Sequence, residues 1–183
     1  VSGATNALFQ SCVGESTGNS GFSIVNAAGC KFHNCSGKST VSFGFYANGT
    51  YNGWDAFHCL GYSTVAVGIR GGRLFNCTGI SDGAAAGEQL YGDGIYNCTF
   101  RSNWDNVAGH AFRLRGGNPT PIDVLNCTLE VTNAGAYCLE QSFLSGDYKI
   151  ANNTFKGSTV AIEPTGITNV VSNTSDSQGN ILI

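Results

Sequence analysis

Phe75-Asn76-Cys77-Thr78-Gly79 is the stretch to which the chain keeps returning. Counting its Cys, or the Asn that replaces Cys in the last two copies, the mark falls at positions 12, 35, 59, 77, 98, 127, 153 and 173. The steps between marks are 23, 24, 18, 21, 29, 26 and 20 residues, a loose period of about 23. Such a period is typical of repeat proteins, in which stacked units bury one continuous core.

A second repeat of apolar residues runs in register with the first. Aligned on one position, its members are Ile24, Phe45, Ile69, Leu90, Leu114, Leu139 and Ile162. The residues two positions earlier are also apolar, except Glu88. This alternation predicts one short strand per repeat with one buried face. At Glu88 we expect a local bulge rather than a buried carboxylate.

The repeat has room for about three short strands and for no helix. Gly-rich turns such as Gly71-Gly72 separate the strands. We therefore predict an all-β solenoid in which residues 1–183 form a single domain of about seven or eight rungs. The chain has no Met and begins inside a repeat, so we expect a fragment of a longer protein.

Composition excludes two classes of partner. The formal net charge is −3 and 11% of residues are charged, so no basic surface for nucleic acid is expected. No apolar run reaches the ~18 residues that a membrane span requires.

Six of the eight Cys occupy the repeat position, while Cys30 and Cys138 do not. A disulfide framework would not place its cysteines once per repeat, so we predict a stack of reduced, buried thiols. No Cys-x-x-Cys pair occurs, so a zinc site is not expected. No clustered set of Asp residues of the calcium-binding kind occurs either, and we expect no metal and no cofactor. Reduced thiols favour folding in a reducing cytosol over export.

With these two ladders, the chain resembles the right-handed parallel β-helix of the pectate-lyase and phage-tailspike superfamily over positions about 5 to 175. The resemblance implies an inward asparagine ladder, whose amides bond up and down the stack. Its expected members are Asn34, Asn76, Asn97, Asn126 and Asn152 or Asn153. The same residues form N-x-S/T sequons, so glycosylation is the rival interpretation, which an inward position would prevent.

The column beside the apolar ladder should face outward. It contains Val25, Tyr46, Arg70, Tyr91, Arg115, Glu140 and Glu163. Tyr rings stack on sugars, and Arg and Glu bind carboxylates and hydroxyls, so this face is a candidate glycan groove. The alternative is a solvated sheet face with weak ion pairs.

Further substrate-binding candidates lie near this column. They are Asp93, Arg113, Trp54 and Trp104. Each Trp either stacks on sugar or contacts a subunit, or else packs its segment against the solenoid.

Glu140 and Glu163 are the catalytic candidates, because residues on adjacent rungs lie roughly 5 Å apart. Two carboxylates about 5–5.5 Å apart suit a retaining glycoside hydrolase. Lyases of the resembled superfamily instead use a basic residue with acidic neighbours, which Arg113 or Arg115 with Asp93 or Asp123 could imitate.

The resemblance also implies a function. A phage tailspike or tail-fibre segment would be a homotrimer that recognises a bacterial surface polysaccharide and, in some cases, depolymerises it. It would belong to the virion tail, assembled in the host cytoplasm. Two alternatives stay open: a non-catalytic β-helix shaft or glycan-binding module, and a secreted polysaccharide lyase.

Overall fold

The computed structural model describes residues 2–25, 28–48, 53–89, 94–114, 122–141, 148–159, 162 and 180–183. These residues form three parallel β-sheets, which we call A, B and C. Sheet A contains β3 (Phe22–Val25), β6 (Phe45–Asn48), β9 (Ile69–Arg70), β12 (Gly87–Gln89), β15 (Phe112–Leu114) and β18 (Leu139–Gln141). Sheet B contains β1 (Leu8–Gln10), β4 (Lys31–His33), β7 (Asp55–Phe57), β10 (Arg73–Phe75), β13 (Ile95–Tyr96), β16 (Ile122–Leu125) and β19 (Tyr148–Ala151). Sheet C contains β2 (Val13–Ser16), β5 (Ser36–Ser39), β8 (Leu60–Ser63), β11 (Thr78–Ser81), β14 (Thr99–Ser102), β17 (Thr128–Val131), β20 (Thr154–Lys156) and β21 (Ile181–Leu182).

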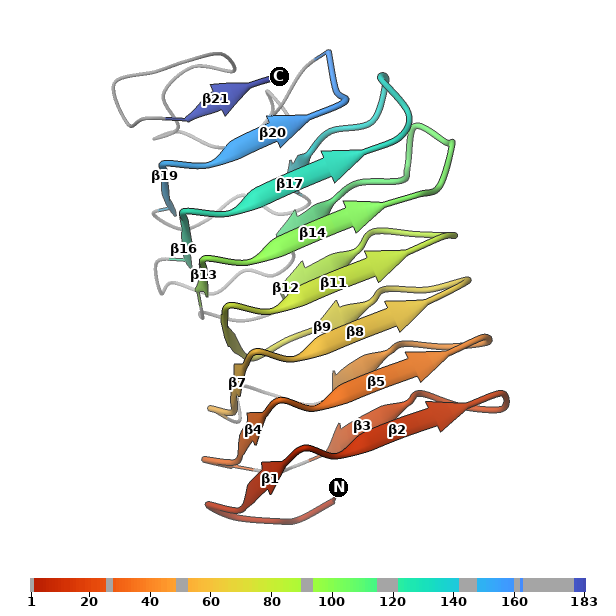
Figure 1. The fold of residues 1–183 in the computed structure, drawn as a ribbon, viewed down its shortest axis with the longest axis vertical. Coiled ribbons are helices and arrows are strands. Elements are labelled where there is room, and N and C mark those ends of the chain that lie inside the picture. Colours follow the sequence, from red (N-terminus) through yellow and green to blue (C-terminus); the bar gives the residue numbers. More distant parts are fainter. Residues whose placement is uncertain are drawn as a thin grey trace.

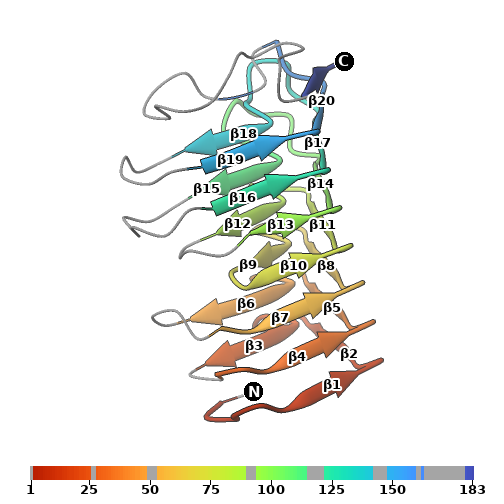
Figure 2. The same ribbon diagram turned by 90° about the vertical axis from the view of Figure 1, so that its left-hand side faces the viewer.

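From β1 to β18 the chain visits the sheets in the order B, C, A, and each pass adds one strand to each sheet. After these passes β19 joins sheet B, and β20 and β21 join sheet C. We call one such pass a rung. Successive rungs climb from the N-terminal end to the C-terminal end, with the strands of sheet C stacked toward the viewer (Figure 1) and those of sheets A and B facing the viewer after a quarter turn (Figure 2). The predicted all-β architecture is confirmed, and three parallel sheets are consistent with a parallel β-helix. In the described part of the chain, no helix is long and apolar enough to cross a membrane.

The corner between sheets B and C is formed by residues with left-handed backbone conformation. Asn34, Asn76, Asn97, Asn126 and Asn152 have φ of 53–57°. Asn tolerates positive φ better than other non-glycine residues, which explains its recurrence at this corner. All five Asn residues are exposed, so the predicted inward position is wrong for Asn34, Asn76, Asn97 and Asn126. Of the two alternatives at the next copy, Asn152 is exposed and Asn153 is the buried, inward residue. The turn points each Asn outward and the following residue inward, so burial gives no argument against glycosylation at these sequons.

The inward ladder of this corner is made mainly of cysteine. The backbone N–H of Cys77 donates to Cys98 Sγ, and that of Cys98 donates to Cys127 Sγ, both at 3.4 Å. Higher in the stack, Cys127 N–H donates to Asn153 Oδ1 at 2.8 Å and Asn153 N–H donates to Asn180 Oδ1 at 3.0 Å. Cysteine sulfur and asparagine amide oxygen are therefore equivalent in this ladder, because each accepts a hydrogen bond from a backbone N–H of the rung below.

The upper end of this ladder differs from the sequence prediction. Asn180, fully buried, takes the place after Asn153 that was assigned to Asn173, which lies outside the described residues. Asn153 also donates to Asn180 Oδ1 at 2.9 Å and to Val124 O at 2.8 Å. A short asparagine ladder thus exists, but it continues the cysteine column rather than occupying the exposed turn positions.

All eight cysteines are free, and seven of them are buried, which confirms the predicted stack of thiols. The hydrogen bond with Cys127, together with burial, raises the pKa of Cys98 to about 12, and burial raises that of Cys138 to about 12. Because the thiolate is the reactive form, these thiols should be inert in the folded protein.

We therefore expect a soluble maleimide at pH ~8 to label only the half-buried Cys12 in the native protein, and all eight cysteines after unfolding. Mass spectrometry of labelled peptides measures this directly. Cys12→Ser should abolish the native label. Rapid native labelling of Cys98 would contradict the structure.

The corner between sheets C and A depends on serine. Residues 16, 39, 63, 81 and 102, each four positions after a column Cys, are all Ser. Ser39 Oγ accepts from Ser42 N–H at 2.9 Å and donates to Asn19 O at 2.6 Å. Ser81 repeats this with Ala84 N–H and Ala66 O, at 3.0 and 2.6 Å. Each hydroxyl thus accepts a hydrogen bond from a backbone N–H of its own turn and donates one to a backbone carbonyl of the rung below.

Sheet C changes its inward residues along the stack. Gly14, Gly37, Gly61 and Gly79 pair in register, and the column continues as Phe100, Leu129 and Phe155. A Cβ on Gly37 would lie 2.5 Å from Gly44 O and 2.8 Å from Phe45 Cδ2. The glycines therefore let sheets C and A approach closely in the first rungs, whereas large side chains fill the later ones.

Candidate functional site

Sheet A carries the face on which function was predicted, and its register differs from the sequence alignment. The inward column is Phe22, Phe45, Ile69, Gly87, Phe112, Leu139 and Ile162. Phe22 and Phe112 replace the predicted Ile24 and Leu114, a shift of two residues that keeps the same face. Gly87 replaces Leu90, a shift of three residues that exchanges the faces.

The outward column is therefore Ser23, Tyr46, Arg70, Glu88, Arg113 and Glu140. Ser23 takes the place predicted for Val25, and Glu88 belongs to this face rather than to the core. The expected bulge at Glu88 is wrong, because Glu88 pairs in regular register with Arg70 and Arg113. Glu88 is only 3% exposed, so it is a buried carboxylate with partners.

Four members of this column form a ladder of alternating charge, Arg70–Glu88–Arg113–Glu140, which we call the ion ladder. Arg70 Nε lies 2.9 Å from Glu88 Oε1, and Arg113 Nη1 lies 3.7 Å from Glu88 Oε2. Arg113 Nε also donates to Glu140 Oε2. The side chains are 23%, 4%, 15% and 19% exposed in chain order, so the ladder is shielded from solvent far better than ordinary surface ion pairs.

Aromatic rings lie at both ends of the ion ladder. At the N-terminal end, the Phe43 and Tyr46 rings stack with centroids 4.6 Å apart, and the Arg70 guanidinium lies 5.2 and 5.4 Å from them. At the other end, His110 stacks on Tyr137 at 5.8 Å. His110 Nε2 lies 3.4 Å from Glu140 Oε2, and its Nδ1 accepts from Tyr137 N–H at 3.2 Å.

The structure brings together four of the predicted site residues, Tyr46, Arg70, Arg113 and Glu140, on one face. Four more, Tyr91, Asp93, Arg115 and Glu163, lie outside the described residues. The Glu140–Glu163 pair therefore stays a prediction, and the preceding residues Leu139 and Ile162 do pair.

The remaining predicted residues lie elsewhere. Trp54 is 2% exposed and packs edge-on against Phe32 in the core, which favours the packing alternative for this residue. Trp104 is half-buried near sheet C, outside the sheet A face. Asp123 lies in sheet B, where it accepts a hydrogen bond from the Tyr96 hydroxyl at 2.9 Å, rather than beside Arg113.

Glu88, Phe43 and His110 also belong to this face, and none of the three was predicted there. The inward residue before Glu88 is Gly87, whose missing side chain leaves room for the rings of Phe100 and Phe112, so no apolar residue marked the register there. His110 could have been found, because it stands two residues before Phe112 as Tyr137 stands two before Leu139.

The arrangement is suited to binding polar ligands at fixed positions. Guanidinium and carboxylate groups alternate at the strand spacing of ~4.8 Å, and partly exposed rings flank them. Among the described residues, no group of three or more His, Cys, Asp or Glu could hold a metal ion. No family model, curated protein or solved structure matches this chain.

Proposed function

We propose that the chain is a segment of a tailspike-type protein, a right-handed parallel β-helix of seven or eight rungs that recognises a bacterial surface polysaccharide along the outer face of sheet A. The observation that carries this proposal is the ion ladder with the Phe43–Tyr46–Arg70 cluster at its end. Glycan sites combine aromatic rings with guanidinium and carboxylate groups in this way. A trimer in the virion tail, assembled in a reducing cytoplasm, agrees with the free thiols, and secretion is the alternative.

Recognition is better supported than cleavage. Both carboxylates of the ion ladder contact Arg113. A hydrolase requires a carboxyl group that can reach the glycosidic oxygen, whereas both of these carboxylates are held by Arg113 and their side chains are only 4% and 19% exposed. A lyase requires a basic residue with access to the substrate, but Arg113 is itself held between two glutamates. The Glu140–Glu163 pair stays a prediction.

The non-catalytic shaft is the second candidate. The observation that favours it is that the charged groups of the ion ladder pair with one another and are mostly buried. A shaft needs rigid rungs and no ligand, so the two candidates differ in whether Tyr46 and Arg70 contact anything outside the chain.

Binding to a panel of capsular and O-antigen polysaccharides, measured by affinity electrophoresis, tests the proposal. We expect Tyr46→Ala to weaken binding about tenfold, because it removes one stacking ring. The matched control is Tyr96→Ala, which removes a half-buried tyrosine from sheet B and should leave binding unchanged. Absence of binding to every glycan would leave the shaft as the better function.

The same polysaccharides, followed for new reducing ends and for the ultraviolet absorbance of unsaturated uronates, test cleavage. If the protein releases reducing ends and Glu140→Gln or Glu163→Gln abolishes that release, the protein is a hydrolase and these two glutamates are its catalytic pair. An ultraviolet signal lost in Arg113→Lys would instead establish a lyase.

A further inference from the structure

Sheet C carries a hollow on its outer face, away from the ion ladder of sheet A. Its larger part, ≈ 470 Å³, is lined by Glu15, Ser36, Lys38, Leu60, Tyr62 and Ile80. Its smaller part, ≈ 230 Å³, is lined by Glu15, Ser16, Thr17, Lys38 and Thr40. The two parts share Glu15 and Lys38, and pockets of such volume hold small ligands. We call them together the sheet C hollow.

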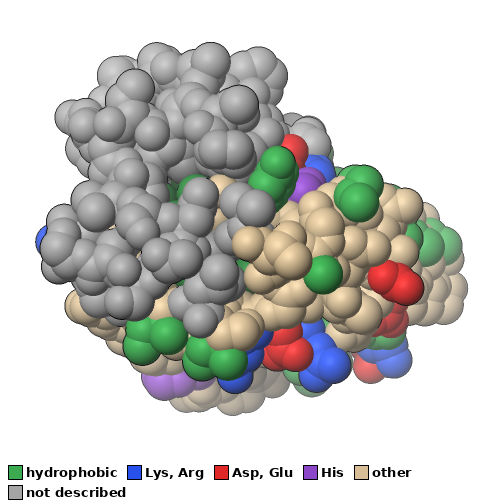
Figure 3. All heavy atoms as spheres, turned by 90° about the horizontal axis from the view of Figure 1, so that it is seen from above, with side chains coloured by type: hydrophobic (Ala, Val, Ile, Leu, Met, Phe, Trp, Pro, Cys, Tyr) green, Lys and Arg blue, Asp and Glu red, His purple; other side chains and the backbone are tan. Residues whose placement is uncertain are grey.

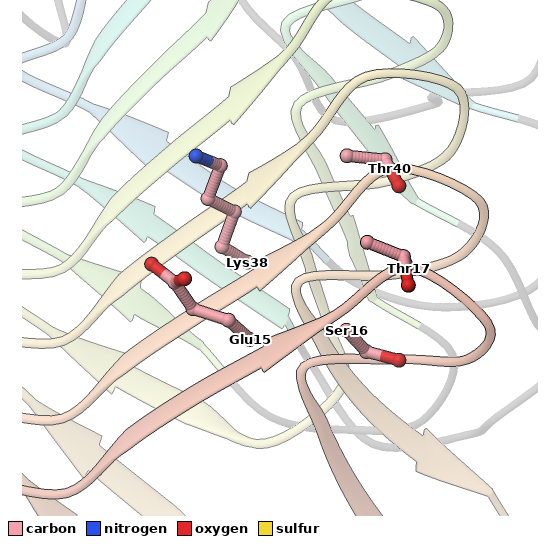
Figure 4. A pocket seen from close by; sticks show the side chains of 5 residues that line it. All are labelled: Glu15, Ser16, Thr17, Lys38 and Thr40. Carbon is pink, nitrogen blue, oxygen red and sulfur yellow. The ribbon is translucent and has the colours of Figure 1, made fainter.

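The lining residues are ordered by the register of the sheet. Glu15, Lys38, Tyr62 and Ile80 are outward neighbours on four successive rungs, and Ser36 and Leu60 belong to the next outward column. The Glu15 and Lys38 side chains extend in the same direction from β2 and β5, with Thr17 and Thr40 at the strand ends (Figure 4). Acidic and basic side chains lie side by side along one edge of the molecule seen from above (Figure 3).

Tyr62 is held in place at the wall of the hollow. Its hydroxyl donates to Asp82 Oδ2, and Asp82 Oδ1 accepts from Asn103 Nδ2 at 2.8 Å. The hydrogen bond to Asp82 raises the pKa of Tyr62, which keeps the phenol protonated. The ring is therefore a fixed, uncharged surface beside the exposed side chain of Leu60.

The charged groups of the hollow are available to a ligand. Within the described residues, neither Glu15 nor Lys38 forms an ion pair, although they are register neighbours. Lys38 Nζ lies 5.9 Å from the centroid of the Tyr62 ring, so its charge stands over an apolar surface. On the next two rungs of the same column, beyond Ile80, Arg101 and Glu130 do approach each other, at 3.7 Å.

We propose that the sheet C hollow binds one acidic pyranose, a uronate-type sugar. Lys38 pairs with the sugar carboxylate, Glu15 accepts hydrogen bonds from ring hydroxyls, and Tyr62, Leu60 and Ile80 contact the apolar face of the ring. The charge that lies over the Tyr62 ring is the ammonium group of Lys38, so a sugar in contact with Tyr62 meets a positive charge, which favours a carboxylate over an ammonium substituent. This site does not depend on the sheet A proposal.

Saturation-transfer NMR and titration with D-glucuronate, D-glucose and D-glucosamine test the site. We expect glucuronate to bind with a dissociation constant on the order of 1 mM, and glucose and glucosamine at least about tenfold more weakly. Lys38→Met should remove the preference for glucuronate, and Tyr62→Phe should retain binding because the ring remains. Lys156→Met, in the same outward column but away from the hollow, is the matched control.

The proposal would be overturned by the absence of a glucuronate signal, or by equal binding by Lys38→Met and the native protein when circular dichroism shows both folded. Equal affinity for glucose and glucuronate would also exclude an acidic-sugar site. Tyr46→Ala should bind glucuronate normally, and Lys38→Met should bind polysaccharide normally. Failure on sheet C is thereby distinguished from failure on sheet A.

Discussion

Glu88→Gln should lower the free energy of unfolding by about 3 kcal/mol, because it leaves the charges of Arg70 and Arg113 without their shared counter-charge in a shielded position. Glutamine keeps the shape of the side chain, so the loss reports charge rather than packing. Urea unfolding followed by circular dichroism measures the difference. The loss should persist in high salt, because shielded charges are poorly screened.

Glu130→Gln is the matched control for this prediction. Glu130 pairs with Arg101 at 3.7 Å on the outer face of sheet C, and its side chain is 37% exposed. An exposed pair of this kind contributes less than about 1 kcal/mol. If Glu88→Gln were no more destabilising than Glu130→Gln, the ion ladder would not be the buried electrostatic element that its geometry indicates.

Gly37→Ala should destabilise the fold by about 3 kcal/mol, at the upper end of what overpacking costs. The added Cβ would lie 2.5 Å from Gly44 O, a backbone atom that cannot move away without displacing sheet A. The unfolding midpoint in urea reports the change, and expression at reduced temperature supplies folded protein.

Gly18→Ala provides the comparison. A Cβ at Gly18 would meet no atom within 4 Å, so the substitution should stay within about 0.5 kcal/mol of the native protein. Equal stability of the two variants would show that sheets C and A are further apart at this corner than the structure has them.

The strand pattern could be predicted from the sequence because the Cys column recurs within the chain and strand alternation has a period of two. The register of sheet A could not be predicted in the same way. Aligning Ile24 instead of Phe22 leaves the inward face unchanged, so hydrophobicity cannot distinguish the two. At Gly87 the inward residue carries no side chain, and the alignment slipped by three residues to Leu90, which placed Glu88 on the wrong face.

The composition of the sheet A face was predicted in part. Tyr46, Arg70, Arg113 and Glu140 were identified because they flank apolar residues of the ladder. Their mutual contacts, and the involvement of His110, depend on which residues face each other across rungs, and that follows from the register. The exposure of the corner asparagines was not predicted. Their spacing in the sequence shows that they belong to the turn, but the direction of each side chain depends on the sign of φ, which the spacing does not reveal.

The step from Gly79 to Phe100 in sheet C means that the repeats are not interchangeable parts. A repeat copied from the glycine-bearing section and inserted within that section would pack against rungs in which sheets C and A are equally close. Inserted after Phe100, it would leave an unfilled space as large as a phenyl ring. Growth of this protein by duplication is therefore permitted inside each section and opposed across the boundary, so that the two sections are expected to lengthen independently of each other.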